Sequence, residues 1–305
     1  MDNVILSAED RGEEVKKFLI EKFGKITNFD RFRCQYENVP FYDVAIFQIE
    51  KQEPLIVKWH EPRKAKKIEI DFYVGEYLFS KGILVPQPKK LFLEFPLIVM
   101  EYLPGKIIME NVENWQVEEM AKILAKLHSF FENEQGTEFI PKVITGTFQE
   151  EIVAKFDSNI HTIEKNLDVD YLERIITIFN KLLKRCSRIS TRGLCHRDVH
   201  YGNWQVHQNG KIYLLDHAQA EFGDIAYDIN KIRKTLQSRE LLEVFRLAYD
   251  ESKFDAANDY EVQILIDLLD ALGILVFLNN YFVKQKKYEA YAYEQINKII
   301  TNMTT

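Results

Sequence analysis

The sequence contains few cysteines, and their spacing does not pair them. The three cysteines among 305 residues are Cys34, Cys186 and Cys195, which cannot all pair within one chain. This usage argues against a disulfide framework and favours reduced thiols in a cytoplasmic protein. The opening segment "MDNVILSAEDRGEEV" also lacks the basic and apolar regions of a signal peptide. We therefore expect a cytoplasmic chain.

Long apolar runs and an excess of basic residues are also absent. The longest apolar-looking run, "IDLLDALGILVFL", contains Asp267 and Asp270 and is too short to span a bilayer. The net charge is −7, whereas proteins that bind nucleic acids usually carry a basic face. We expect neither a membrane nor a nucleic acid as a partner. A negative chain is compatible with a cationic substrate, although overall charge does not locate a pocket.

The remaining composition is that of an ordinary globular protein. Hydrophobic residues make up 46% of the chain and charged residues 29%, and we find no internal repeat or low-complexity tract. The length allows one large domain or two modest ones, with ample core.

The first hundred or so residues alternate between helical and β-rich segments. An amphipathic helix is expected around residues 8–23, and residues 25–60 then contain three short β-rich runs with polar or proline-containing breaks. Such runs are typical of a meander. A helix ending near Gly82 follows, and two strands broken around residues 94–96 complete a small α+β unit.

The rest of the chain is mainly helical. "NWQVEEMAKILAKLHSFF" and "YLERIITIFNKLLKRC" place apolar residues at helical intervals, and the C-terminal segment is also mostly helical. One β-like island interrupts this half, where Asn209-Gly210 between two alternating runs predicts a two-residue hairpin turn. We expect two lobes, a sheet-containing one at residues 1–103 and a helical one at residues 104–305.

A cluster of polar residues precedes this hairpin. The stretch "GLCHRDVHYGNW", residues 193–204, contains His196, Asp198 and Asn203, and the hairpin returns to Asp216. Phosphoryl transfer needs a carboxylate that accepts or orients the hydroxyl proton, and Mg²⁺ that prefers oxygen ligands. Asp198 fits the first role, and Asn203 and Asp216 fit the second. The alternative is that Asp198 and Asn203 only cap turns while Asp216 ends a strand.

These motifs resemble a known family. "HRDVHYGN" matches the H-R-D-x-x-x-x-N catalytic loop of kinases. "LCHRDVHYGNW" and "IYLLDHAQAEFGDIAYDI" are similar to segments of the kinase-like small-molecule phosphotransferases, which include aminoglycoside phosphotransferases, choline kinases and spore-coat-associated kinase-like proteins. "AKILAKLHSF", "VKW", "GILVPQP" and "VMEYLPG" resemble further landmarks, so that the likeness covers about residues 25–235. It implies an α+β, bilobal, protein-kinase-like fold, with a small antiparallel-sheet N-lobe and a mainly helical C-lobe.

The resemblance also implies roles for residues of the catalytic loop and its surroundings. Asp198 resembles the catalytic base, and His196 a residue that braces the loop through hydrogen bonds. Asn203 and Asp216 resemble the magnesium ligands, and Asp228 resembles the acid that supports the loop from behind.

For ATP, the resemblance implies that Lys58 contacts the α- and β-phosphates and that Glu101 to Leu103 form the hinge that binds adenine. A lysine flanked by apolar residues at a strand end can also merely extend its charge to solvent. The helix partner of Lys58 is ambiguous, because distance from the helix end favours Asp71 and residue type favours Glu69. The two cannot share a helix face, and we rank Glu69 first.

The histidines give no metal motif. His128, on an amphipathic helix, is interpreted as a structural residue. His200, His207 and His217 fit no zinc spacing, which favours oxygen-bound magnesium. His217 is a candidate contact for substrate or phosphate.

Two departures from kinase patterns affect the interpretation. The turn before Lys58, "QYENVPFYD", has no glycine to bring backbone amides close to a phosphate. Arg197 is the residue that protein kinases use, whereas small-molecule kinases often have glycine or another residue there. The segment after Asp216 nevertheless has no "APE" anchor, which favours a small-molecule kinase.

We therefore predict an ATP- and magnesium-dependent kinase that phosphorylates a hydroxyl of an aminoglycoside, a choline-like amine or a sugar. Acidic residues of the C-terminal helices could attract a cationic acceptor, although solvated helix faces explain them equally well. These residues are Asp250, Glu251, Asp255, Asp259, Glu261, Asp267 and Asp270. The alternative function is a catalytically weak or inactive kinase-like binding or coat-associated protein, which the glycine-poor turn favours.

Overall fold

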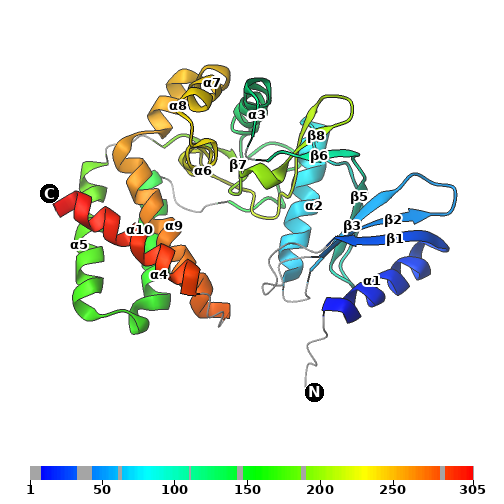
Figure 1. The fold of residues 1–305 in the computed structure, drawn as a ribbon, viewed down its shortest axis with the longest axis horizontal. Helices are drawn as coiled ribbons and strands as arrows, with labels where there is room; N and C mark the ends of the chain where they lie inside the picture. Colours follow the sequence, from blue (N-terminus) through cyan, green and yellow to red (C-terminus); the bar gives the residue numbers. More distant parts are fainter. Residues whose placement is uncertain are drawn as a thin grey trace. The chain divides into compact units, whose positions relative to one another are not determined.

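The structure is a computed structural model that describes residues 8–32, 43–60, 64–109, 111–142, 147–186, 190–281 and 286–304. The chain forms two compact units, shown in Figure 1. Unit 1 comprises Met1–Leu127, Asn133–Pro141 and His200–Ala220, and unit 2 comprises His128–Glu132, Lys142–Val199 and Glu221–Thr305. The chain therefore passes from unit 2 into unit 1 directly after Val199.

Unit 1 is built on a five-stranded antiparallel sheet. Its strands follow the order β1-β2-β3-β5-β4, in which the first three neighbours are consecutive in sequence, as expected for a meander. The elements are α1 (Ala8–Phe23), β1 (Ile26–Phe32), β2 (Asp43–Ile49), β3 (Leu55–Trp59), α2 (Ala65–Ser80), β4 (Pro88–Phe92) and β5 (Leu97–Glu101). The helix expected at residues 8–23 and the two strands on either side of residues 94–96 are confirmed.

The strands send alternate side chains to opposite faces of this sheet, as the period of two requires. One face packs against α1 in a core that contains Leu19, Phe47, Val57 and Trp59. The intervening residues line a cavity on the other face. Lys58 belongs to this second set, and its register partners are Val44 on β2 and Ile98 on β5.

A second, three-stranded sheet completes the β structure of unit 1. It has the order β6-β8-β9, with β6 at Gly105–Ile107, β8 at Trp204–His207 and β9 at Ile212–Leu214. The hairpin predicted at Asn209-Gly210 is confirmed, but its loop has three residues instead of two, because Val206 pairs with Ile212 and the His207 N–H donates to the Lys211 carbonyl at 2.9 Å. Gly210 adopts the left-handed φ of 78° that favours glycine there. The helix α3 (Asn114–Leu127) and the 3₁₀ turn η3 (Tyr201–Asn203) also belong to this unit.

Unit 2 is mainly helical. Its two short strands, β7 (Arg192–Cys195) and β10 (Glu221–Asp224), pair antiparallel. The helices are α4 (Phe148–Ile163), α5 (Val169–Arg185), α6 (Ala226–Leu236), α7 (Arg239–Tyr249), α8 (Glu251–Ala257), α9 (Tyr260–Tyr281) and α10 (Lys286–Thr304), with the 3₁₀ turn η2 (Glu164–Asn166) after α4. Helix α9 packs against α4, α5, α6 and α10. The α+β fold class expected from the sequence is confirmed.

Local sequence signals explain where these helices begin. Thr147 and Glu150 form a capping box at α4, in which the Thr147 hydroxyl accepts from the Glu150 N–H at 3.2 Å. The Asp168 carboxylate likewise accepts from the Tyr171 N–H at the start of α5.

Two sequence expectations concern the cysteines and membrane spans. Cys186 and Cys195 are buried free thiols, while Cys34 lies outside the described residues. Of the helices in the described ranges, none combines the length and the apolar character needed to cross a membrane.

Candidate active site

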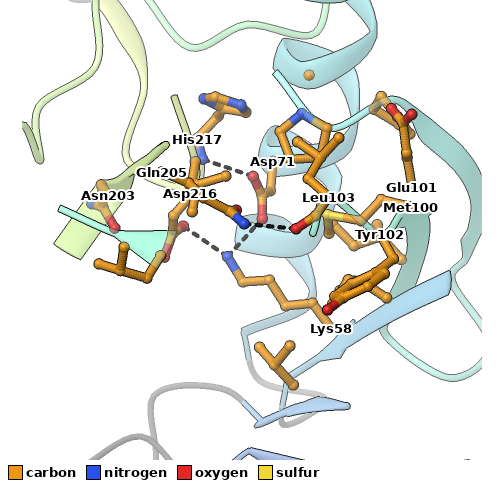
Figure 2. A pocket seen from close by; sticks show the side chains of 18 of the residues that line it. Lys58, Asp71, Met100, Glu101, Tyr102, Leu103, Asn203, Gln205, Asp216 and His217 are labelled. Carbon is orange, nitrogen blue, oxygen red and sulfur yellow. Dashed lines mark hydrogen bonds and ion pairs between the residues drawn. The ribbon is translucent and has the colours of Figure 1, made fainter. Parts of the chain in front are cut away.

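A cavity of about 370 Å³ lies in unit 1, on the sheet face opposite α1. Its floor is apolar, with Val44, Ile46, Ile56 and Ile98 from the strands. Its polar groups come from β3, α2, the segment after β5 and the ends of the hairpin, and Figure 2 shows how they point toward one another. A cavity with an apolar wall and a few convergent polar groups is typical of a small-molecule site.

The ammonium group of Lys58 links two carboxylates in this cavity (Figure 2). Lys58 Nζ lies 2.7 Å from Asp71 Oδ2 and 2.7 Å from Asp216 Oδ1. The side chains of Lys58 and Asp71 are each 5% exposed, and that of Asp216 is 15% exposed. Lys58 is therefore fixed by ion pairs inside the cavity and does not extend to solvent.

Glu69, which the sequence analysis ranked first as the partner of Lys58, is a wrong prediction. Its carboxylate contacts Lys66 Nζ at 3.2 Å on the outer side of α2, and Asp71 takes the place beside Lys58. Residues two apart on a helix point to different faces. Asp71 lies on the face of α2 that also buries Ile68 and Val74, whereas Glu69 does not.

Gly75 allows helix α2 to lie close to the cavity. A Cβ atom at this position would lie 2.9 Å from Pro88 Cγ and 3.7 Å from His217 Cδ2. Because Gly75 is one helical turn after Asp71, the close approach occurs on the face that carries the carboxylate. The aspartate side chain, one methylene shorter than glutamate, can therefore reach Lys58. Gly75 was not among the predicted residues, although a glycine inside a helix is itself a signal of a packing requirement.

Asp71 also holds the chain after Asp216. The His217 N–H donates to Asp71 Oδ1 at 2.7 Å, so one carboxylate contacts both Lys58 and the His217 backbone. Burial, followed by the neighbouring charge of Asp216, raises the pKa of Asp71, and Lys58 opposes this shift. His217 lines the cavity, as its candidate role requires, but what it binds stays a prediction.

The hairpin brings Asn203 and Asp216 to the same end of the site. Trp204 pairs with Leu214, and the Leu215 N–H donates to the Asn203 carbonyl at 2.9 Å. Both Asn203 and Asp216 line the cavity, and Asp216 has a left-handed φ of 58°. A carboxylate and an amide oxygen at one end of a cavity are the hard donors that Mg²⁺ prefers, so these residues fit a magnesium site.

Residues 101–103, the predicted hinge, offer backbone groups at the cavity wall. Glu101 and Leu103 line the cavity, the Glu101 N–H donates to the Gln87 carbonyl at 2.9 Å, and the Leu103 carbonyl accepts from Gln205 Nε2 at 2.6 Å. Among the residues that the structure describes, the Leu103 N–H has no hydrogen-bond partner. This donor can therefore recognise an acceptor nitrogen of a bound ring.

The segment that carries Asp198 lies in unit 2 and is held by Asp228. This buried carboxylate accepts from the N–H groups of His196 at 2.7 Å and Arg197 at 2.8 Å, and contacts His128 Nε2 at 3.0 Å. The pKa of Asp228 is lowered: burial alone raises it, but the hydrogen bond and charge of His128, with the charges of His196 and Arg197, outweigh burial. The loop backbone is therefore fixed from inside the unit, and Asp198 itself is half-buried.

His128 was interpreted from the sequence as structural, and the structure shows what it supports. His128 Nδ1 lies 2.6 Å from the Tyr249 hydroxyl, while Nε2 contacts Asp228. It thus connects α7 to the acid that holds the loop. The signal available in the sequence was the "LH" pair at the end of a helix, but the partners of His128 are 100 and 121 residues away in sequence.

The predicted residues are therefore distributed over both units. Lys58, Glu101, Leu103, Asn203 and Asp216 line the cavity of unit 1. His196 and Asp198 belong to unit 2, and the chain connects them to Asn203 through Val199 and His200. The glycine-poor turn was predicted at residues 35–43, and of these only Asp43 belongs to the described residues.

Residues 42–262 match the sequence model of the phosphotransferase enzyme family, and this match covers more than half of the chain. The protein belongs to this phosphotransferase family. A comparison of the sequence with curated proteins finds no match.

Solved structures of other phosphotransferases share the fold. An ethanolamine kinase of Plasmodium vivax is 17% identical, with a TM-score of 0.69, and the match covers 99% of this chain and 92% of that chain. A choline kinase of Streptococcus pneumoniae is 14% identical, with a TM-score of 0.68 and coverage of 95% and 98%. A thermostable mutant of aminoglycoside phosphotransferase APH(4)-Ia, in ternary complex with AMP-PNP and hygromycin B, is 15% identical, with a TM-score of 0.68 and coverage of 94% and 98%. These likenesses confirm the protein-kinase-like fold expected for this phosphotransferase.

Proposed function

We propose that the protein is an ATP- and magnesium-dependent phosphotransferase that transfers the γ-phosphoryl group to a hydroxyl of a small molecule. The observation that supports this most directly is the bridge from Lys58 to Asp71 and Asp216 in an apolar cavity. An ammonium group held between carboxylates is kept in place for phosphate oxygens, and a nearby Asn203 supplies a further oxygen ligand. The related aminoglycoside phosphotransferase structure with AMP-PNP is consistent with ATP as the donor.

Within this proposal, the nucleotide occupies the cavity of unit 1. The apolar floor packs against the adenine ring, and the Leu103 N–H donates to a ring nitrogen. Lys58 orients the α- and β-phosphates, with Asp71 holding its ammonium group in position. Asn203 and Asp216 would hold magnesium, which supplies neutralisation of phosphate charge. Residues 1–103 remain the proposed N-terminal nucleotide-binding lobe and residues 104–305 the proposed catalytic and substrate lobe, although unit 1 also includes Asn133–Pro141 and His200–Ala220.

Asp198 is the proposed catalytic base. It accepts or orients the proton of the acceptor hydroxyl while the phosphoryl group moves in line, and His196 and Asp228 hold its loop. Because the covalent chemistry required of the protein is small, positioning carries much of the rate, worth up to about 7–11 kcal/mol.

The acceptor is proposed to be a hydroxylated small molecule, as it is in the choline and ethanolamine kinases with this fold. The acidic helices give little support for a cationic one, because most of their carboxylates have partners within unit 2. Asp267 and Asp270 pair with Lys234, Glu251 and Asp255 contact Arg246, and Asp250 and Asp259 cap helices. A neutral acceptor, such as a sugar, is therefore an equal candidate. A cytoplasmic setting stays part of the proposal.

The test is ATP consumption by the purified chain against a panel of hydroxylated amines, sugars and antibiotics, with and without magnesium. We expect magnesium-dependent transfer to at least one member of the panel, and transfer slower by about 10²–10⁴-fold in the Asp198→Asn variant. The alternative, an inactive kinase-like binding protein, predicts nucleotide-dependent stabilisation without transfer. A ligand at one hundred times its dissociation constant stabilises the fold by about 2.7 kcal/mol, so thermal unfolding with MgATP measures binding, and the transfer assay then separates the two cases.

A further inference from the structure

Four charged side chains form a closed ring of ion pairs beside the Asp198 loop in unit 2. Arg197 contacts Glu151 through its Nη2 atom at 2.8 Å and Glu221 through Nε at 2.9 Å. Lys155 contacts the same two carboxylates, at 3.1 Å and 3.5 Å. The ring therefore has alternating charge and no net charge, and it ties α4, β10 and the loop together.

The ring lies over the aromatic side chain of Tyr227 on α6. The guanidinium carbon of Arg197 and Nζ of Lys155 each lie 4.0 Å from the centre of the Tyr227 ring. Both cations thus gain a cation–π contact in addition to their carboxylates. Glu151 also accepts from the Asp224 N–H at 3.3 Å, which joins the network to the end of β10.

Within the ring, the side chains of Arg197 and Glu151 are much more buried than those of Lys155 and Glu221. The side chain of Glu151 is 1% exposed and that of Arg197 is 9% exposed, whereas Lys155 and Glu221 reach solvent. A buried charge is tolerated only with a well-placed partner, so each of these two residues constrains the other. The Arg197 guanidinium donates to Glu151 through Nη2, and its permanent charge also lies beside Glu221.

Arg197 directly precedes Asp198, and its backbone is in the left-handed region with a φ of 67°. This conformation is unfavourable for a residue with a long side chain, so the surroundings must hold it. Asp228 holds the Arg197 N–H, and the ring holds the side chain. The direction in which the chain leaves Arg197 sets where Asp198 is presented.

We propose that Arg197, anchored by Glu151, is a positioning residue that sets the orientation of Asp198 for phosphoryl transfer, an inference that rests on the proposed function. The simpler interpretation is that the ring only stabilises unit 2. The two differ in one measurable respect. A positioning role affects the transfer step itself, whereas a stabilising role affects unfolding and leaves the turnover of folded protein unchanged.

The test uses Arg197→Gly and Glu151→Gln in the full chain. Glycine adopts a positive φ readily, so the first variant removes the side chain while allowing the native backbone conformation. Glutamine removes the charge of Glu151 at nearly constant size. The matched control is Arg246→Gln, because Arg246 contacts three carboxylates in unit 2, Glu243, Glu251 and Asp255, none of which is in the Asp198 loop.

The measurements are kcat and KM for MgATP, by phosphate release to water and by transfer to an active panel member, with thermal unfolding of each variant. We expect both ring variants to lower kcat by about 10²-fold, because small displacements of a reacting group have effects of that size. The KM for MgATP should change by less than about twofold, since the ring and the cavity belong to different units. The double variant should resemble the single ones, because the two residues act as a unit.

The outcomes separate this inference from the proposed function. If the wild-type chain neither transfers phosphate nor releases it from MgATP, the proposed function is wrong. If the wild type is active and Arg197→Gly or Glu151→Gln retains its kcat, the positioning role is wrong and the ring is structural. An equal loss of kcat in Arg246→Gln, or failure of both ring variants to fold at low temperature, would also overturn it.

Discussion

Lys58 and Asp216 lie far apart in sequence, yet their charged groups meet at 2.7 Å inside the cavity of unit 1. The same ammonium group contacts Asp71, so the strand β3, the helix α2 and the hairpin all converge on Lys58. Two carboxylates in a buried site repel one another unless a cation lies between them. The lysine therefore has a structural role in addition to the phosphate contact proposed for it.

Replacing Lys58 with methionine should test both roles. We expect unfolding stability to fall by about 3–5 kcal/mol, because the variant leaves buried carboxylates without their partner. Affinity for ATP should fall as well. Urea unfolding and ATP titration measure the two effects, and the double variant Lys58→Met/Asp71→Asn should recover part of the stability but none of the affinity. Full recovery of ATP binding in the double variant would exclude a phosphate contact by Lys58.

Asp198→Asn should separate binding from transfer. The amide keeps the size of the side chain but cannot accept the hydroxyl proton, so we expect kcat to fall by about 10²–10⁴-fold. ATP affinity should change little, because Asp198 is not among the residues that line the cavity. Single-turnover transfer and ATP-induced thermal stabilisation give the two quantities. Turnover at the wild-type rate would remove Asp198 from the role of base.

Asp216→Ala should instead abolish the effect of magnesium on nucleotide binding. Of the two proposed magnesium ligands, Asp216 supplies the negative charge and Asn203 only an amide oxygen, so the remaining site is weak. We expect ATP binding that is weaker and equal with and without magnesium, measured by calorimetry. Asp216→Asn, which preserves side-chain size, is the control for packing. If the alanine variant still binds MgATP as the wild type does, the metal ligands are elsewhere.

Much of the fold was predictable because its signals are local. Along β2 and β3, successive side chains point alternately into the core beside α1 and into the cavity, and the sequence pattern reflects this alternation. Asn209-Gly210 specifies a hairpin within a few residues. The placement of Asn203 beside Asp216 followed from that hairpin alone. The sequence therefore predicted the structure wherever residues that are close in sequence are also close in space.

The rest depended on contacts between distant segments. The choice between Glu69 and Asp71 is decided by how closely α2 approaches β4, which depends on Gly75 meeting Pro88. Likewise, nothing near Arg197 in sequence identifies Glu151 as its partner, because the two meet only after α4 and the loop have packed together.

Gly75→Ala should show how much of the site depends on that approach. The added Cβ would lie 2.9 Å from Pro88 Cγ, so one of the two residues must move. We expect α2 to shift away and the contact between Lys58 and Asp71 to lengthen. We expect overpacking of about 1–3 kcal/mol to exceed the gain in helix propensity, and the KM for ATP to rise. Gly273→Ala is the matched control, because an added Cβ at this helical glycine would have no atom within 4 Å beyond its own stretch of helix. It should stabilise the protein by up to about 1 kcal/mol. An unchanged KM in Gly75→Ala would mean that α2 tolerates the methyl group without moving.

His60, at the end of the β3 segment, should make stability depend on pH. Burial lowers its pKa from 6.5 to about 3, with a further contribution from the positive charge of Lys58. Between these values the unfolded chain binds a proton that the folded chain does not. The free energy of unfolding is therefore unaffected by His60 above pH 6.5 and decreases as the pH falls from 6.5 toward 3, by at most about 1.4 kcal/mol per pH unit.

His60→Gln should remove this dependence. Relative to the wild type, the variant should therefore become more stable as the pH falls below 6.5. Urea unfolding at several pH values measures the difference. Parallel curves for the wild type and His60→Gln would show that His60 gains its proton as easily in the folded protein as in the unfolded chain.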